Sequence, residues 1–518
     1  MKELVYSRFL LPAVERLPDK VAVADEGFEA TFDQHLDRVL RLADAMTSEL
    51  GLRPGDRVAV TALNGHRYLE LYHAAFLSGL CINPLNLRLA PRELSFILSD
   101  SGTEVCFADA LFGPGVAGIR AEVGLRSLVL MGDGDIGHDA SHDDLVAAGE
   151  PRLPEEPDED DPAVLMYTGG TTGLPKGVVV DHRAAMLDLY KVAAAFTMDE
   201  GYVYLHQTPM FHAASFGGVL ATPAAGGRST FVPAFDPKAV LDVIERQQVT
   251  MTVMVPTMVG MLLAHPDFRP ERLSSMRHLV YGASPMPSAL LERLMTALPE
   301  VDIWQGYGMT ENCGLLTLLR PEDHRRGGDI LRSAGRPVLG AVVRIEDEEG
   351  RVVAPGETGE ICARAGNFMH GYWNRPEETA EAFRGGWYHT GDAGYVDADG
   401  YVYLVDRVKD MIVTGGENVY SVEVENAVAS HPAVAQVAVI GIPSEQWGEA
   451  VHAIVVLKPD ASATEEEIRD HARGLIAGYK VPKTVEFRTE QLPLSGAMKV
   501  LKRELRAPYW EGQGRSVN

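Results

Sequence analysis

The period of the hydrophobic pattern changes along the chain, and these changes predict where strands and helices lie. From about residue 57 the segment DRVAVTAL is typical of a strand, residues 66–80 of a helix, and VCFAD of another strand. Apolar runs of strand length that alternate with helical periodicity are typical of α/β proteins. The alternation continues with the strand VLMYT at 164–168, helices at 183–196 and 237–248, and the strands VTMTVMVP and HLVYGAS. We therefore expect stacked βαβ units that form Rossmann-like parallel sheets.

A different pattern begins at about residue 335, where short strands alternate with turn signals. VVRIEDEEGRVV and GEICARA are examples, and they indicate an antiparallel, barrel-like β subdomain near 335–405. From about residue 410 the chain returns to α/β patterning, with a helix at 421–430, strands VAQVAVIGI and AVHAIVVL, a helix at 464–477 and the strand TVEF. We expect this last part to fold as a separate, small α/β domain. The acidic, Pro-rich run at 150–162 is expected to be an exposed connection.

The length of 518 residues exceeds what one compact domain needs and predicts a multidomain protein. The 47 basic and 73 acidic side chains give a net charge of −26, which repels phosphate backbones and anionic lipid surfaces. Nucleic acid is therefore not an expected partner. The first residues mix charged with apolar positions, so no secretory signal is expected, and no apolar stretch reaches the length of a transmembrane segment.

The cysteines Cys81, Cys106, Cys313 and Cys362 are scattered, and none forms a CxxC pair. We interpret them as reduced thiols and expect a cytoplasmic protein. Peripheral contact with a membrane and the oligomeric state, including a homodimer, stay open at this point.

The segment YTGGTTGLPKGV at 167–178 carries the strongest chemical signal. It follows a buried strand, and it offers bare backbone N–H groups, hydroxyl donors and a mobile cation, which together suit a polyphosphate. It is not a Walker P-loop, because Lys176 is followed by Gly177 and no hydroxyl occupies the magnesium position. The candidate phosphate-binding residues are Thr168, Gly169, Gly170, Thr171, Thr172, Gly173 and Lys176.

This loop resembles the phosphate loop of the adenylate-forming (ANL) superfamily, which includes acyl-CoA synthetases, adenylation domains and beetle luciferases. Further segments resemble its motifs in the same order: QGYGMTE at 305–311, YHTGD at 388–392, DRVKDMIVTGGENVYSVEVE at 406–425 and LPLSGAMKVLKREL at 492–505. The resemblance implies an N-terminal AMP-binding domain over 1–408 and a mobile C-terminal lid domain over 409–518, with a hinge at Lys409. It also implies ATP and coenzyme A as substrates and Mg²⁺ as cofactor.

The motif at 305–311 suits a nucleotide, because small residues around Tyr307 let its ring lie flat on a purine and Glu311 offers hard oxygens to Mg²⁺. By resemblance, Tyr307 stacks on adenine, Thr310 contacts the α-phosphate, and Glu311 binds Mg²⁺ together with Thr171. The other residues implied to line the site are Gly282, Ala283, Ser284, Gln305, Gly306, Gly308 and Met309.

The resemblance assigns the sugar to residues further along the chain. Asp392, in a turn next to a glycine, suits two hydrogen bonds from a ribose diol. By resemblance Asp392 binds the ribose, and Arg407 contacts the same sugar or the phosphate.

Lys499 is implied to be the catalytic cation of the adenylation step. The superfamily pattern reads Gly-Lys here, whereas this chain has Met498-Lys499. A methionine held at φ > 0 costs about 1–2 kcal/mol, so either the loop takes an ordinary conformation or the adenylation pose is weakened. For the second half-reaction, the resemblance implies that a rotated lid lines the pantetheine tunnel with Gly415, Gly416 and Trp447.

On the acyl side, PMFHAASF at 209–216 resembles the aromatic motif of the superfamily. His212 occupies the place where amino-acid-activating members carry an aspartate, so an acid without an α-amine is favoured. The alternative for His212 is a hydrogen-bonded core histidine. Gly308 occupies the place of a tryptophan in acetyl-CoA synthetases, which favours acids longer than acetate.

The expected function is therefore an ATP-dependent carboxylic acid:CoA ligase that works through an acyl-adenylate, with a medium or longer aliphatic or an aryl acid as substrate. Two alternatives stay open. An acyl-AMP ligase that loads a carrier protein would use the same adenylation residues. A non-catalytic nucleotide- or acyl-adenylate-binding protein would account for Met498.

Overall fold

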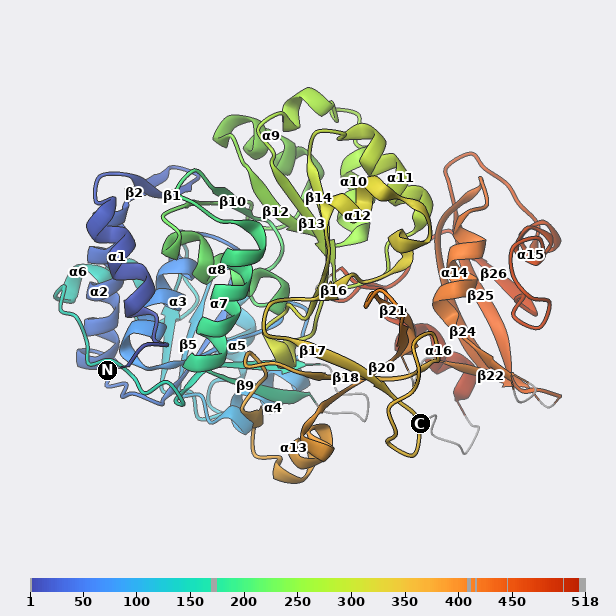
Figure 1. Cartoon of the computed structure of the whole chain (residues 1–518). Helices are drawn as coiled ribbons and strands as arrows, with labels where there is room; N and C mark the ends of the chain where they lie inside the picture. The colour runs from blue at the N-terminus through green and yellow to red at the C-terminus, as the bar shows by residue number, and fades with distance from the viewer. Residues whose placement is uncertain are drawn as a thin grey trace.

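The computed structural model describes residues 2–168, 175–407, 411–414, 417–444, 446–496 and 498–511. Within these residues the chain forms an N-terminal body around three sheets and a smaller C-terminal lobe around a fourth. Figure 1 shows the body in blue to light orange and the lobe, in darker orange and red, beside it. The α/β architecture expected from the hydrophobic pattern is confirmed.

The first sheet, in spatial order, consists of β16 (Arg336–Pro337), β15 (Thr317–Leu319), β14 (Asp302–Tyr307), β13 (His278–Gly282), β12 (Met251–Met254), β10 (Val203–His206), β11 (Arg228–Phe231), β1 (Val21–Asp25) and β2 (Phe28–Thr31). The strands from β14 to β1 in this order pair in parallel. Parallel strands end at the same edge of a sheet, and ligand sites of open α/β sheets lie outside that edge. The carboxyl ends of β13 and β14 therefore mark the place to look for a site.

The second sheet consists of β19 (Gly371–Tyr372), β9 (Lys176–Asp181), β8 (Pro162–Thr168), β4 (Cys81–Pro84), β3 (Arg57–Thr61), β5 (Val105–Ala108), β6 (Ser127–Leu130) and β7 (Ala140–Ser141). The strands from β4 to β7 pair in parallel, whereas β8 and β9 form an antiparallel hairpin. This hairpin carries the predicted phosphate loop between its strands.

Helices cover both faces of the first sheet. Tyr204 and Met251 belong to the face that packs against α7 (His182–Phe196) and α8 (Ala213–Ala224). Leu279 belongs to the other face, which packs against α9 (Pro237–Gln247), α10 (Pro256–Ala264) and α11 (Ser288–Ala297). The helix α3 (His66–Ser78) is buried along nearly its whole length, as expected for a helix enclosed between sheets.

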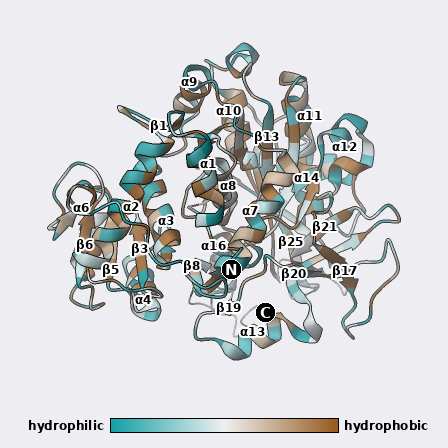
Figure 2. Ribbon diagram, turned by 60° about the vertical axis from the view of Figure 1, so that its left-hand side comes forward, coloured by the Kyte–Doolittle hydropathy of each residue, from teal (hydrophilic) through white to brown (hydrophobic). Residues whose placement is uncertain are grey.

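The other helices of the body lie closer to its surface. They are α1 (Ser7–Arg16), α2 (Phe32–Ser48), α4 (Pro91–Ser101), α5 (Gly113–Ile119), α6 (His142–Ala148), α12 (Pro321–Arg326) and α13 (Pro376–Ala382). Figure 2 shows hydrophilic residues gathered on outer helices such as α9 and α12. No helix in the described ranges combines the length and the apolar character needed to cross a bilayer.

The third sheet is the antiparallel β subdomain expected near 335–405. It consists of β17 (Val342–Glu346), β18 (Gly359–Arg364), β20 (Tyr388–Val396) and β21 (Val402–Arg407). The acidic run at 150–162 connects α6 to β8, and its exposure is only partial. Glu156 and Glu159 accept hydrogen bonds from Ser7 and from the Leu4 backbone, so the run also holds the start of the chain.

The C-terminal lobe consists of β22 (Ile412–Thr414), β23 (Glu417–Val419), β24 (Val434–Ser444), β25 (Gly448–Leu457) and β26 (Thr484–Arg488), with α14 (Ser421–Ala429), α15 (Glu465–Arg473) and α16 (Lys502–Trp510). Its expected strands and helices are present. The helix expected over 464–477 ends at Arg473, because Gly474 follows and glycine has a low helix propensity.

Candidate active site

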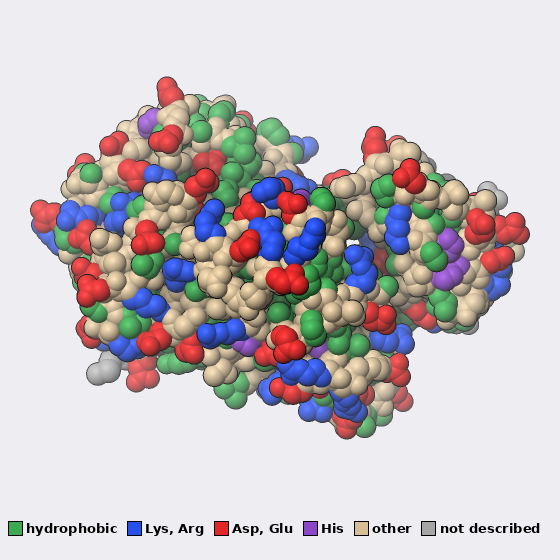
Figure 3. Space-filling model, turned by 90° about the horizontal axis from the view of Figure 1, so that it is seen from above, with side chains coloured by type: hydrophobic (Ala, Val, Ile, Leu, Met, Phe, Trp, Pro, Cys, Tyr) green, Lys and Arg blue, Asp and Glu red, His purple; other side chains and the backbone are tan. Residues whose placement is uncertain are grey.

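A cavity of about 4210 Å³ opens where the carboxyl ends of the first sheet, the third sheet and the C-terminal lobe meet. Gly282, Tyr307, Asp392 and Lys499, which come from these three parts, all line it. Pockets for one ligand commonly measure about 300–1000 Å³, so this cavity has room for several substrates. Figure 3 shows the hollow between body and lobe from above, with Lys and Arg side chains beside it.

Both ends of the predicted phosphate loop reach this cavity. Thr168 of β8 lies opposite Lys176 of β9, and both line the cavity. Lys176 pairs with Glu378 of α13, and its Nζ lies 5.3 Å from the centre of the Tyr372 ring. The predicted residues between the two strands, Gly169, Gly170, Thr171, Thr172 and Gly173, lie outside the described residues.

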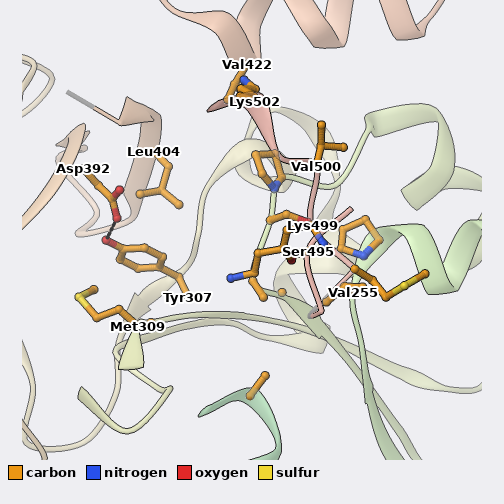
Figure 4. A pocket seen from close by; sticks show the side chains of 18 of the residues that line it. Val255, Tyr307, Met309, Asp392, Leu404, Val422, Ser495, Lys499, Val500 and Lys502 are labelled. Atoms are coloured by element: carbon orange, nitrogen blue, oxygen red, sulfur yellow. Dashed lines mark hydrogen bonds between the residues drawn. The ribbon is translucent and has the colours of Figure 1, made fainter. Parts of the chain in front are cut away.

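Tyr307 and Asp392 form one wall of the cavity. The Tyr307 hydroxyl donates a hydrogen bond of 2.7 Å to Asp392 Oδ2, which joins β14 to β20 (Figure 4). Arg407 lies opposite Asp392 in β21, although its side chain is outside the described part. Two residues that are distant in sequence and were predicted separately therefore meet.

The backbone beside this wall is packed unusually closely. A Cβ on Gly282 would lie 2.3 Å from Gly306 O, and one on Gly308 would lie 2.2 Å from Gly314 O. A glycine at 308 is thus required by the close backbone contact with Gly314, in addition to the space that it was expected to leave for the acid. Ala283 has a left-handed φ of 66°, a strained conformation of the kind found at binding sites. The predicted residues Ser284, Gln305, Gly306, Gly308, Met309 and Thr310 also line the cavity.

Glu360 of β18 holds the segment of β20 that presents Asp392, so the turn expected around Asp392 is instead part of a strand. Its Oε1 accepts a hydrogen bond of 3.1 Å from the Gly391 N–H, and its Oε2 lies 2.9 Å from His389 Nδ1. Arg384 donates to the same Oε2 at 2.7 Å. The carboxylate of Asp392 therefore projects from a strand segment with little freedom.

Glu346 of β17, Cys362 of β18 and His389 of β20 lie close together, with potential metal-ligating atoms within 4.8 Å of one another. Arg344 pairs with Glu346, as Arg384 does with Glu360. The negative charges here are thus balanced by arginines, and we interpret the group as structural support for the Asp392 segment of β20.

Glu311 lies in a short 3-10 turn, η2 (Thr310–Asn312). The Tyr372 hydroxyl donates to Glu311 Oε1 at 3.0 Å, and the Met369 N–H donates to Glu311 O at 2.6 Å. The carboxylate is thereby oriented from β19 while it lines the cavity.

Asn367 anchors the same turn from inside the protein. Its fully buried side chain donates to Asn312 O at 2.8 Å, to Leu315 O at 3.3 Å and to Asp188 Oδ1 at 3.0 Å, and its Oδ1 accepts from Lys191. Burial raises the pKa of Asp188 to about 7 and lowers the pKa of Lys191. A buried polar network that is well hydrogen-bonded fixes one conformation. The turn with Glu311 thus has a rigid base.

His212 caps the N-terminus of α8 and lines the cavity. Its Nδ1 accepts a hydrogen bond of 3.1 Å from the Ala214 N–H. Burial, and secondarily the Lys499 ammonium, lower the pKa of His212 to about 3. A neutral imidazole whose Nδ1 accepts must carry its proton on Nε2. His212 is therefore a neutral hydrogen-bond donor. It is both a hydrogen-bonded histidine of the fold and a residue that borders the cavity, so the two interpretations made from the sequence apply together.

An apolar wall continues from the carboxyl edge along the first sheet. It is lined by Val192 and Phe196 of α7, Gly217 and Gly218 of α8, Tyr204 of β10, Met251 and Val253 of β12, and Val280 of β13. At the carboxyl edge of the sheet, Gly282 of β13 lies beside Gly306, and four residues earlier in β13 His278 lies beside Met251. The wall from the carboxyl edge down to Met251 is therefore about 13 Å deep.

Lys499 comes to the cavity on a turn of the C-terminal lobe. An antiparallel bridge joins Leu494 to Val500, and Met498 has a φ of 61°. The ordinary conformation considered for Met498 is therefore not adopted. The cost of about 1–2 kcal/mol is offset in part, because the Met498 side chain packs against the buried cluster around α10 and α11.

The residues implied to serve the second half-reaction are less fully described. Lys409, Gly415 and Gly416 lie outside the described residues. Trp447 lines the cavity with 41% of its surface exposed, and Lys483 Nζ lies 5.6 Å from the centre of its ring.

Glu360, Tyr372 and Asn367 were not singled out from the sequence. Glu360 is one of many acidic residues, and Asn367 lies in an irregular segment between β18 and β19. The signal that was available for Tyr372 is only an aromatic residue next to Gly371.

Comparison with known proteins agrees with this geometry. The sequence profile of the AMP-binding enzyme family matches residues 11–373, and that of the AMP-binding enzyme C-terminal domain matches residues 423–499. A feruloyl-CoA synthase of Amycolatopsis sp is 40% identical over 95% of this chain and 96% of its own. A fatty acid–[acyl-carrier-protein] ligase, ScoC of Streptomyces coeruleorubidus, is 37% identical over 97% and 96%.

A solved structure shows the same fold. The anthranilate CoA ligase AuaEII in complex with anthranoyl-AMP superposes with a TM-score of 0.91 at 28% identity, and the match covers 99% of this chain and 98% of that one. Together with the motifs and the cavity, these matches show that the chain belongs to the AMP-binding enzyme family of the adenylate-forming superfamily, in its acyl-CoA synthetase branch.

Proposed function

We propose that this protein is an AMP-forming acid–thiol ligase that performs two half-reactions in its single large cavity. In the first, a carboxylate oxygen attacks the α-phosphorus of ATP, the bond to the bridging oxygen breaks, and pyrophosphate leaves. In the second, a thiol sulfur attacks the acyl carbon of the acyl-adenylate, AMP leaves, and the thiol proton is released. The observation that carries the proposal is that Lys499 of the lobe lines the same cavity as Tyr307, Asp392 and Glu311 of the body.

The wall made by Tyr307 and Asp392 suits the nucleoside. The Tyr307 ring offers an apolar face to adenine, and Asp392 Oδ2 is held by the Tyr307 hydroxyl. We propose that this oriented carboxylate, which lines the cavity, accepts a hydrogen bond from a ribose hydroxyl. The restraint from Glu360 means that little conformational entropy is lost when the sugar binds.

The acid carboxylate is expected to lie between His212 and Lys499. His212 is neutral, so its Nε2–H can donate to a carboxylate oxygen without changing its own charge. The Lys499 ammonium counteracts the negative charge that accumulates on the phosphates during attack. A fixed charge at the reacting centre is the kind of contribution that stabilises a transition state most.

Mg²⁺ fits the donor set at Glu311. The carboxylate is a hard oxygen ligand that lines the cavity and is oriented by Tyr372. We propose that Glu311 holds the ion and that Thr171 contributes a second oxygen. When bound, the ion would neutralise phosphate charge.

The thiol step requires access for a second substrate, because Lys499 fills part of the cavity in the first step. We propose that the lobe turns about Lys409 and presents Gly415, Gly416 and Trp447 to the adenylate. The size of the cavity and the exposure of Trp447 support this proposal.

The acyl group is proposed to be a medium-length aliphatic or an aryl chain. The wall along the first sheet is apolar and about 13 Å deep, and each zigzag carbon–carbon bond advances the chain by about 1.25 Å. A chain of roughly ten carbons or a substituted phenylpropenoate would fill that length. The branch that contains a feruloyl-CoA synthase fits this class of acid.

The acceptor is proposed to be coenzyme A, and a carrier-protein phosphopantetheine is the second candidate because of the similarity to ScoC. The test is a panel of aliphatic and aryl acids, scored first by Mg²⁺-ATP-dependent pyrophosphate release and then by mass spectrometry of the thioester. Pyrophosphate without acyl-CoA, followed by acylation of a holo carrier protein, would assign the second acceptor. If no acid in the panel gives pyrophosphate, the proposed ligase function is contradicted.

A further inference from the structure

The turn that carries Lys499 is held together by its own hydrogen bonds. We call residues 494–496 and 498–500 the lysine turn. The Ser495 N–H donates to Lys499 O at 2.7 Å, and the Lys499 N–H donates to Ser495 Oγ at 3.1 Å. A turn braced in this way moves as a unit, so the place of Lys499 depends on where the turn rests against the body.

Two side chains of the body donate hydrogen bonds to the backbone of the lysine turn. Arg88, which follows β4, donates from Nη1 to Leu494 O at 2.7 Å. Thr257, in the first turn of α10, donates from Oγ1 to Met498 O at 2.9 Å. Figure 4 shows Lys499 and Ser495 next to Val255, which immediately precedes α10. The turn is thus held from both of its sides.

Gly496 brings the lysine turn close to the body. A Cβ at this position would lie 2.2 Å from Asn86 Oδ1 and 3.1 Å from Phe211 Cζ. The φ of Gly496 is not in the left-handed region, so the backbone itself would accept alanine. Glycine is required at 496 because any side chain would clash with Asn86. This clash arises only while the lysine turn rests against the body.

Met498 adds an apolar contact to the same junction. Its side chain packs against the buried cluster of α10 and α11, and its Sδ lies 3.9 Å from Arg88 Nη2. A glycine at 498 would relieve the strain at φ 61° but would lose this contact. The departure from the Gly-Lys pattern therefore gives the lysine turn an anchor that glycine lacks.

We infer that Arg88, Thr257, Gly496 and Met498 are positioning residues that hold Lys499 in the cavity for adenylation and must separate before the thiol step. The inference rests on the proposed two-step function. None of these residues needs to touch a substrate. Their loss should slow the half-reaction that uses Lys499 and spare the one that does not.

The sharpest test is Gly496→Ala. We expect adenylation, measured as pyrophosphate release, to slow by about 100-fold, because a shift near 1 Å at a reacting group has that effect. Thioester formation from supplied acyl-adenylate should stay within about twofold of the unmodified protein. The matched control is Gly478→Ala, in the same lobe, where a Cβ would meet nothing within 4 Å.

Asn86→Ala in the Gly496→Ala background tests the contact itself. Removal of Asn86 Oδ1 makes room for the new Cβ, so adenylation should recover by about tenfold or more relative to Gly496→Ala alone. The single variant Asn86→Ala gives the baseline. Failure of the second change to rescue the first would overturn the steric part of the inference.

Arg88→Ala should slow adenylation by about tenfold while the KM for ATP changes by less than about twofold. Arg88→Lys should recover part of the rate, because it retains one donor. Equal loss in both half-reactions for Gly496→Ala and Arg88→Ala would overturn the inference, and so would an unchanged adenylation rate.

A readout that does not need catalysis separates this inference from the proposed function. Hydrogen exchange of the lysine turn should be faster in Gly496→Ala and Arg88→Ala than in the unmodified protein and in Gly478→Ala. If exchange is faster in the variants but the unmodified protein shows no ligase activity, the proposed function is contradicted while the anchoring of the lysine turn is supported. If exchange is unchanged in the variants and the protein is active, only the anchoring of the lysine turn is contradicted.

Discussion

The Tyr307 hydroxyl donates a 2.7 Å hydrogen bond to Asp392 Oδ2, and this contact joins the first sheet to the third across the wall of the cavity. Asp392 cannot rotate freely, because its part of β20 is also fixed by Glu360 through the Gly391 N–H. The Tyr307 hydroxyl thus fixes the orientation of the Asp392 carboxylate in the wall of the cavity.

Tyr307→Phe tests this arrangement. The ring face stays, but Asp392 loses a hydrogen bond of the charged kind, which contributes about 1.5–3 kcal/mol. We expect the KM for ATP in the pyrophosphate assay to rise by about tenfold with a smaller change in kcat. Tyr190→Phe, at an exposed tyrosine, is the control. A KM for ATP that equals that of the control would show that the hydroxyl does not matter for the nucleotide.

His212 variants separate the helix cap from the chemistry. Asparagine and aspartate both cap helices well, so His212→Asn and His212→Asp should melt close to the unmodified protein. Adenylation should fall by about tenfold in His212→Asn and by about 100-fold or more in His212→Asp, because a carboxylate repels the acid substrate. If His212→Asp were as active as His212→Asn, the acid would not lie near this residue.

The pKa of His212, lowered to about 3, also predicts how the rate of adenylation depends on pH. The imidazole remains neutral from pH 5 to pH 8, so its titration contributes no change of rate in that window. The pH profiles of the unmodified protein and of His212→Asn should have the same shape and differ only in height. A limb near pH 6 that disappears in the variant would contradict this assignment.

Asp188 should make stability depend on pH. Its pKa is raised to about 7 by burial, above its value in the unfolded chain, so the folded state holds the proton more tightly. The resulting contribution to stability is complete below about pH 4 and is lost as the pH rises towards 7, at up to about 1.4 kcal/mol per pH unit.

Asp188→Asn removes this titration and can still accept the hydrogen bond from Asn367. The difference in melting temperature between the unmodified protein and Asp188→Asn, measured from pH 5 to pH 8, should shift in favour of the variant as the pH rises. A difference that stays constant over this range would show that Asp188 is ionised throughout.

The residues that could be predicted from the sequence share a physical reason. Tyr307, Glu311, Asp392 and Lys499 lie in short segments where glycine, aromatic and charged residues occur together, and such segments are recognisable without a structure. The order of strands and helices was equally clear, because apolar runs of strand length such as β3 alternate with longer segments such as α3 and α7.

The supporting residues could not be predicted, because their importance arises from contacts between distant parts of the chain. Arg88 and Leu494 are 406 positions apart, and Asn367 and Asp188 are 179 apart. Each is an ordinary polar or charged residue in its local sequence. The left-handed φ of Met498 was one of two possibilities at the sequence level, and only the packing around α10 shows why it is tolerated.

The most direct test of the central claim is Lys499→Ala assayed in the two half-reactions separately. If Lys499 serves the cavity only while the acyl-adenylate is being made, pyrophosphate release should fall by about 100- to 1000-fold, the usual effect of removing one stabilising charge. Thioester formation from supplied acyl-adenylate should remain close to that of the unmodified protein. An equal loss in both half-reactions would contradict the alternating use of one cavity by the C-terminal lobe.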